Sequence, residues 1–154
     1  MVSAILHQLT RNMTIDEILE MPDVQERIEV YNEQTALFKK MVKEHTTLNG
    51  NVIITDLRDV NPIYTGNRFL IYSIYPDQNI SAWIVSGKGG QGCSAAVGYS
   101  ILNKTSKVNV GSLMLKYGGG GHKTACGLTL YPENLHFKDN VFEDLKNLVM
   151  KEGK

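Results

Sequence analysis

The apolar residues of this chain change their spacing once, at the turn signal Asn49-Gly50. Before this turn they recur three, four or seven residues apart, which predicts one apolar face of a long helix over residues 23–45. Beyond it they form short β-branched and aromatic runs, which predict strands. The sequence therefore predicts a helical arm or linker, residues 1–48, followed by an α/β domain, residues 49–154.

The helical arm carries signals for where its helices begin and end. Thr14-Ile15-Asp16-Glu17 fits a capping box, in which a Thr hydroxyl and a Glu carboxylate bind free N–H groups at a helix start. Pro22 disfavours helix in the residue before it and can open the next helix. We expect the apolar face of the long helix to lie in the core or between subunits, as in a homodimer through residues 23–45. Its members are Val24, Ile28, Tyr31, Phe38 and Met41.

Five strands and two further helices are predicted beyond the turn. The predicted strands are residues 52–54, 69–75, 80–85, 95–102 and 125–131. Residues 76–79 are expected to turn, and residues 87–92 to form a hairpin tip. A short helix is predicted at 110–117, and a closing helix on Val141, Leu145, Leu148 and Val149. Together these predict a mixed central β-sheet of about five strands, flanked by helices and preceded by the helical arm.

The length and the cysteine content exclude several classes of protein. With 154 residues, the chain can form one domain that needs no disulfide or metal to hold its core. No apolar run approaches the roughly 18 residues that a membrane span needs, and the N-terminus lacks the pattern of a signal peptide. Cys93 and Cys126 are too few for a disulfide scaffold. We therefore expect a cytoplasmic protein with no membrane partner.

The formal net charge is zero, but charge and glycine are distributed unevenly. Residues 78–132 contain no Asp or Glu and five lysines, and eleven of the 14 glycines lie between residues 87 and 127. Clustered positive charge raises the local concentration of anionic ligands, and glycine lets backbone N–H groups approach an anion closely. This segment is therefore the expected anion-binding part of the chain. Chance spacing of surface lysines is the alternative.

The most informative motif is Gly118-Gly119-Gly120-Gly121-His122-Lys123, directly after the predicted helix at 110–117. One glycine is expected just past a helix end. Three more are not explained by capping, and each increases the entropy lost on folding. Consecutive N–H groups followed by an imidazole and an ammonium would suit a phosphate oxygen. A flexible connector is the alternative, and the spacing does not fit a Walker loop.

The stretch from Tyr117 to Gly127 resembles the glycine–histidine signature in the C-terminal domain of DHH-family phosphoesterases. That family includes nanoRNases, oligoribonucleases and exopolyphosphatase-like proteins. Residues 97–111, Asp56-Leu57-Arg58 and Gly66-Asn67-Arg68-Phe69 look like the exopolyphosphatase-like branch. The resemblance extends over most of the chain, from about residue 6 to residue 130.

The resemblance implies the substrate-binding domain of a metal-dependent phosphoesterase acting on short oligonucleotides, nucleoside bisphosphates or polyphosphate. The residues it implies for phosphate binding are Gly118, Gly119, Gly120, Gly121, His122, Lys123, Asn103 and Lys104, the last where relatives tend to carry Arg. The family's metal-binding half, usually with manganese, has no counterpart here: the chain lacks an Asp-His-His triplet and an Asp-x-Asp pair. We therefore expect no catalytic or metal-ligating residue in this chain, and an N-terminal DHH catalytic domain as its partner.

Two other functions stay open. The chain could be a non-catalytic nucleic-acid-binding or dimerisation module with a structural glycine loop. It could also be a self-contained hydrolase with His122 as general base, for which we expect no turnover. Arg68 could reach an anion, and Trp83 and Tyr99 could stack on a base, although a surface arginine and core aromatics are commoner. We expect Cys126 to be a buried side chain and not a nucleophile.

Overall fold

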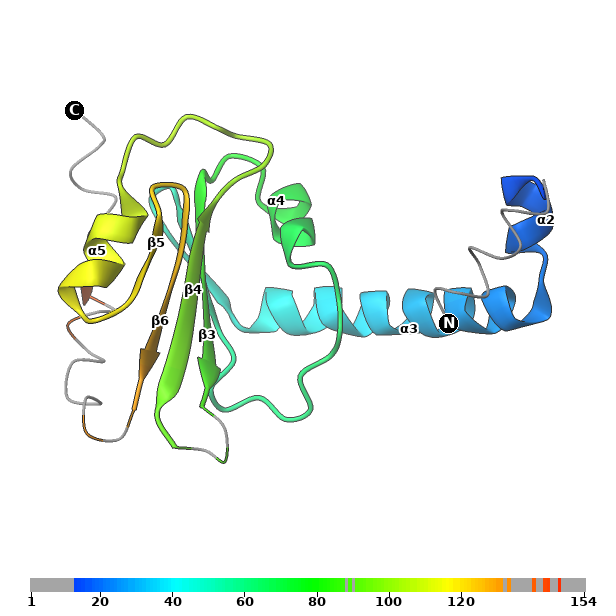
Figure 1. Cartoon of the computed structure of the whole chain (residues 1–154), viewed down its shortest axis with the longest axis horizontal. Helices are drawn as coiled ribbons and strands as arrows, with labels where there is room; N and C mark the ends of the chain where they lie inside the picture. The colour runs from blue at the N-terminus through cyan, green and yellow to red at the C-terminus, as the bar shows by residue number, and fades with distance from the viewer. Residues whose placement is uncertain are drawn as a thin grey trace.

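The computed structural model describes residues 13–87, 89, 91–131, 133, 140, 143–144 and 147. These residues form a six-stranded sheet with helices on both faces and a helical arm projecting to one side (Figure 1). The predicted α/β class with its N-terminal arm is therefore confirmed. The predicted closing helix lies outside the described residues, since Val141, Leu145, Leu148 and Val149 are not among them. None of the described helices combines the length and the apolar character that crossing a bilayer requires.

The arm consists of two helices, α2 (Ile15–Leu19) and α3 (Pro22–Glu44). The predicted capping box is present, because Thr14 accepts from the Glu17 amide and the Glu17 carboxylate accepts from the Thr14 amide at 2.7 Å. Pro22 occupies the first turn of α3, where its missing N–H costs nothing. The junction between the two helices therefore follows directly from its local sequence.

Only the last part of α3 lies in the core. Phe38, Met41 and Val42 are buried, whereas the side chains of Val30 and Tyr31 are 53% and 58% exposed. The outer part of α3 projects away from the sheet, with α2 at its far end (Figure 1). The apolar face predicted for this helix is thus a core contact only at its C-terminal end. Its proposed role between two subunits stays a prediction.

The sheet contains one parallel pair, β2 with β3, and is otherwise antiparallel. The order across it is β1-β2-β3-β4-β6-β5. Its strands are β1 (Thr46–Asn49), β2 (Val52–Asp56), β3 (Ile80–Ser86), β4 (Cys93–Tyr99), β5 (Gly120–His122) and β6 (Ala125–Leu130). Strands β1 and β5 were not predicted. Strand β1 spans the predicted boundary between the helical arm and the α/β domain, which lies between residues 48 and 49. The division of the chain into these two parts stays a prediction.

The prediction of a strand at residues 69–75 is wrong. The segment forms a 3-10 turn, η1 (Arg68–Leu70), and a short helix, α4 (Ile71–Ile74), within the crossover from β2 to β3. The Asn67 side chain starts the turn by accepting from the Phe69 amide at 3.0 Å. The neighbouring residues Ile71 and Tyr72 are both buried, which a half-buried strand with alternating faces would not allow. Burial therefore overrides the β propensity of this run.

The two faces of the sheet are covered differently. Helix α5 (Val110–Lys116) covers one face, against Ile80, Ala82 and Ile84 of β3 and their neighbours. On the other face, α3 and α4 pack against Ile53 of β2 and Trp83 of β3. No residue of β4, β5 or β6 belongs to that second cluster among the described residues. The α3 side of these three strands is the open face of the sheet.

Candidate functional site

The glycine run connects α5 to the hairpin of β5 and β6. Its first two amides already serve the helix end: Gly118 donates to the carbonyl of Leu115 at 3.2 Å, and Gly119 to that of Met114 at 2.9 Å. Gly118 has a positive φ of 81°, as expected just past a helix end. Both amides would have to break these bonds to act as phosphate donors, so any anion site lies further along the run.

Close packing explains two of the remaining glycines. A Cβ at Gly119 would lie 2.5 Å from the carbonyl oxygen of Gly127, and one at Gly121 would lie 2.5 Å from that of Ala125. Gly121 also has a φ of +146°, which side-chain-bearing residues rarely adopt. A Cβ at Gly120, in contrast, would meet no atom within 4 Å. Gly120 is therefore the glycine of this run that the fold of the chain does not require.

His122 is the last residue of β5 and is exposed. It pairs with Ala125 of β6, and Gly120 pairs with Gly127. Paired residues in adjacent strands point to the same face, whereas Cys126 points to the α5 face, where its thiol contacts the Val110 carbonyl at 3.3 Å. The imidazole and the open space at Gly120 therefore lie together on the open face of the sheet.

A hollow of about 190 Å³ lies at the sheet edge beside the run, between Gly120, Gly121 and Lys123 on one side and the start of α5 on the other. The Lys123 carbonyl accepts from the Val110 amide at 3.1 Å, which fixes the turn against α5. The Lys123 residue is exposed. The hollow is lined by Asn109, Gly111, Ser112, Leu115, Gly120, Gly121 and Lys123. None of these carries a carboxylate that would repel an anion.

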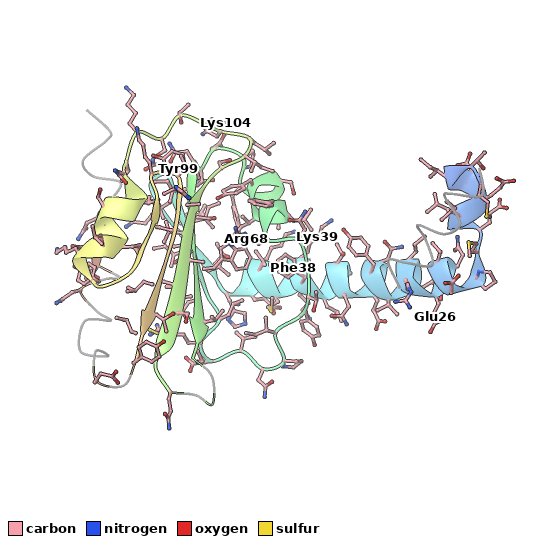
Figure 2. The ribbon with its side chains drawn as sticks, in the orientation of Figure 1. Glu26, Phe38, Lys39, Arg68, Tyr99 and Lys104 are labelled. Atoms are coloured by element: carbon pink, nitrogen blue, oxygen red, sulfur yellow. The ribbon has the colours of Figure 1, made fainter. Side chains whose placement is uncertain are left out.

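The other two predicted residues lie apart from this hollow. The Asn103 amide donates to the Asp77 carbonyl at 2.8 Å and accepts from the Thr105 hydroxyl at 2.7 Å, so the side chain holds the loop of residues 100–109 in place. Lys104, in the same loop above the sheet, is exposed (Figure 2). Neither lines the hollow at the glycine run. The structure thus places Gly120, Gly121 and Lys123 at the hollow, and His122, which does not line it, beside Gly120 on the open face. The phosphate-binding role of these residues stays a prediction.

The open face contains two adjoining cavities of about 100 and 300 Å³, which share Trp83 and Ala96. Arg68 and Phe69 line the smaller one, together with Ala125, the strand partner of His122. Sequence reasoning favoured a surface role for Arg68 because it expected a strand to follow. The helical turn at residues 68–70 instead directs this segment over the sheet. Identifying Arg68 as a cavity residue required knowing that residues 68–70 form a helical turn and not a strand.

Core packing accounts for Tyr99, which packs against the cluster under α5 and whose hydroxyl donates to the Val108 carbonyl. Cys126 is only partly buried, so the expectation of a buried side chain is met in part. Burial raises the pKa of the Cys126 thiol to about 11. Because the thiolate is the reactive form, this agrees with the expectation that Cys126 is not a nucleophile.

The described residues contain no group of three His, Cys, Asp or Glu side chains that could hold a metal ion. Asp56 is instead bound by Arg58, whose Nη2 lies 2.5 Å from a carboxylate oxygen. The hydrogen bonds from Arg58 lower the pKa of Asp56. This carboxylate therefore has a structural partner at the end of β2.

No protein-family model matches the chain, and no curated protein matches it. Among solved structures, the chain is similar to the pGpG-specific phosphodiesterase PggH of Vibrio cholerae, with a TM-score of 0.89 and 37% sequence identity. The match covers 99% of this chain and 51% of that protein, so the chain spans about half the length of this relative. The chain is thus similar to half of a phosphodiesterase, in sequence as well as in fold.

Proposed function

We propose that this chain is the substrate-binding half of a DHH-type phosphodiesterase, and that Gly120 and His122 hold a phosphate of a short 5′-phosphorylated oligonucleotide. Gly120 carries the proposal, because the packing of the chain leaves open space where its side chain would stand, beside an exposed imidazole. A ligand that approaches this backbone closely explains why no side chain is present. The similarity to half of a phosphodiesterase supports this class of function.

The surrounding charge supports an anionic ligand. No Asp or Glu occurs between residues 78 and 132, so strands β3 to β6 and the loops between them contribute no carboxylate. Asp144 lies beside Tyr117, just before the glycine run, and is paired there with Lys116 at 2.8 Å. An imidazole and the Lys123 ammonium can both donate to phosphate oxygens, and hydrogen bonds to a charged acceptor are the strong ones. A phosphorylated nucleotide agrees better with this site than an uncharged substrate.

Binding and hydrolysis are divided between domains in this proposal. His122 binds and orients the phosphate, and activation of the attacking water belongs to a partner catalytic domain that holds the manganese of DHH enzymes. The described residues do not fit a metal centre, since they lack a cluster of three suitable ligands. We therefore propose that this chain by itself binds the substrate without hydrolysing it.

His122→Ala is expected to weaken binding of pGpG by roughly 10- to 100-fold, the worth of a hydrogen bond to a charged group. Isothermal titration calorimetry of the 154-residue chain at two salt concentrations measures this effect. His45→Ala is the matched control, because His45 is also exposed but lies at the end of α3. Binding that is absent or insensitive to salt in the wild type, or unchanged in His122→Ala, contradicts the proposal.

Replacing Gly120 tests the close approach of the ligand without disturbing the fold. A side chain here meets no protein atom within 4 Å, so Gly120→Ala and Gly120→Val should change the free energy of unfolding by less than about 0.5 kcal/mol. The larger side chain should weaken pGpG binding more, by about tenfold or more for Val if it displaces the phosphate from its donors. Wild-type affinity in Gly120→Val would show that nothing approaches this backbone.

A further inference from the structure

A groove formed by the two cavities runs along the open face from Thr124 and Ala125 toward Ser94 and Thr129. Ala125 is the strand partner of His122, and directly paired residues lie within about 5.5 Å of each other. The groove therefore begins beside the proposed phosphate site. A ligand held there by its phosphate would extend into it.

The wall of the groove is aromatic. Trp83 lines both cavities, and its ring stacks on Phe38, with the ring centroids 5.9 Å apart and the planes at 16°. Phe38 is buried, so Trp83 is held in a fixed orientation. Phe69 lines the smaller cavity and is 40% exposed. Rigid aromatic rings that remain partly accessible are suited to stacking on a nucleobase.

The polar groups at the bottom of the smaller cavity satisfy one another. The Tyr72 hydroxyl lies 2.6 Å from the Ser81 hydroxyl and donates to the Gly98 carbonyl at 3.1 Å. They therefore offer little capacity to distinguish one base from another. Hydrogen-bond selectivity in this cavity has to come from another side chain.

Arg68 is the charged side chain of the cavity lining, which also includes Thr124 with its hydroxyl and Trp83 with its indole. Its guanidinium lies over the Phe69 ring, 5.2 Å from the ring centroid, and forms no ion pair with any carboxylate among the described residues. It lies on the α3 side of the sheet, opposite α5 (Figure 2). A guanidinium has donors only. Guanine presents two acceptors on one edge, N7 and O6, whereas adenine presents an acceptor and a donor there.

We propose that this groove binds a guanine base, stacked against Trp83 and Phe69 and recognised by Arg68 through N7 and O6. The inference rests on the proposed function in one respect, since the phosphate of the same ligand would lie at Gly120 and His122. It adds a base site and a residue that sets base specificity. In this proposal Arg68 binds the base through hydrogen bonds, and its role is not a nonspecific electrostatic attraction of phosphate.

The experiment compares three ligands: pGpG, the corresponding diadenylate pApA, and inorganic tripolyphosphate. Arg68→Met should weaken pGpG binding by roughly 10- to 100-fold, the range for one bidentate arginine–guanine contact, while pApA and tripolyphosphate change by less than about threefold. Arg68→Lys keeps the charge but lacks the two-pronged donor geometry, so it should also lose the preference for pGpG. Lys39→Met is the matched control, because Lys39 is exposed on α3 and lines neither cavity.

Fluorescence provides a second measurement that depends on the base site alone. Trp83 is the only tryptophan of the chain, so a base that stacks on it should quench the emission. We expect pGpG to quench Trp83 and tripolyphosphate to leave it unchanged. Thermal unfolding of each variant tests whether the protein is still folded. Because Arg68 is exposed, we expect its substitutions to leave the unfolding temperature nearly unchanged.

The outcomes separate this inference from the proposed function. Equal losses for pGpG and pApA in Arg68→Met, an equal effect of Lys39→Met, or no quenching by pGpG would overturn the guanine site while leaving phosphate binding intact. Loss of all three ligands in His122→Ala supports the phosphate site independently. No binding of any ligand to the wild type overturns both proposals.

Discussion

Gly121→Ala is expected to lower the free energy of unfolding by roughly 3 kcal/mol or more. Two costs combine: a strained backbone conformation costs about 1–3 kcal/mol, and forcing a methyl group into a packed site costs a similar amount. The new Cβ would lie 2.5 Å from both the Ala125 oxygen and the Cys126 Cα, so β6 would have to move away. Urea unfolding followed by circular dichroism measures the change through the transition midpoint.

Gly120→Ala is the matched control for this experiment, because it adds the same methyl group one residue earlier. We expect its unfolding midpoint to stay near the wild-type value, since nothing occupies the space beside Gly120. Equal destabilisation by the two substitutions would show that the fold excludes a side chain at Gly120 as strongly as at Gly121. The distinction between structural and functional glycines would then be wrong.

Phe38→Ala is expected to cost about 3–5 kcal/mol, the usual range for removing a buried phenylalanine ring. The ring is 4% exposed, stacks on Trp83, and fits so closely against Gly66 that a Cβ there would lie 2.3 Å from its Cγ. With Met41 and Val42, Phe38 is one of the three buried residues of α3 in the cluster that joins this helix to the sheet. Thermal and urea unfolding measure the loss of stability.

The same variant should alter the groove, because Trp83 loses the ring that holds it in place. We expect a shift of the Trp83 emission even in the absence of ligand. Tyr31→Ala is the control on the same helix, since Tyr31 is 58% exposed and its removal should cost less than about 0.5 kcal/mol. A loss below 1 kcal/mol in Phe38→Ala would mean that α3 is held mainly by other contacts.

Local sequence was sufficient where a segment carries its own boundary signals. The capping box at Thr14 and the proline at residue 22 located the two arm helices. The strands β3, β4 and β6 agree with the predicted runs to within about three residues at each end. The expected hairpin tip between β3 and β4 is closed by a hydrogen bond from the Gly87 amide to the Gly92 carbonyl at 3.1 Å.

Segments that depend on a distant partner were missed. Strand β1 is short and mostly exposed, and it is held through its pairing with β2, including a contact of 2.8 Å between the hydroxyls of Thr46 and Thr55. No periodicity within four residues can indicate such a pairing. The run at residues 69–75 has strand-like composition, but its helical form buries Ile71 and Tyr72 together. Only the tertiary environment decides between these two forms.

The candidate site was located in the sequence but not resolved into its parts. The sequence does not distinguish the four consecutive glycines from one another. It cannot show that a Cβ added at two of them would lie 2.5 Å from backbone atoms of β6. Nor can it show that the amides of Gly118 and Gly119 are occupied by the end of α5. Separating Gly120 from its neighbours, and Arg68 from an ordinary surface arginine, required the three-dimensional arrangement.

Because the C-terminal end of α3 is packed against the sheet around Phe38, the number of residues in the arm determines where α2 lies and in which direction it points. Each residue of an α-helix advances it by about 1.5 Å and rotates it by about 100°. A single insertion between Tyr31 and Phe38 would therefore turn α2 by more than a quarter of a circle around the helix axis. Seven inserted residues would return α2 to within about 20° of its original direction, about 10 Å further out. An insertion in α3 therefore changes the direction of α2 around the helix axis, whereas substitution of the exposed side chains of the arm leaves that direction unchanged.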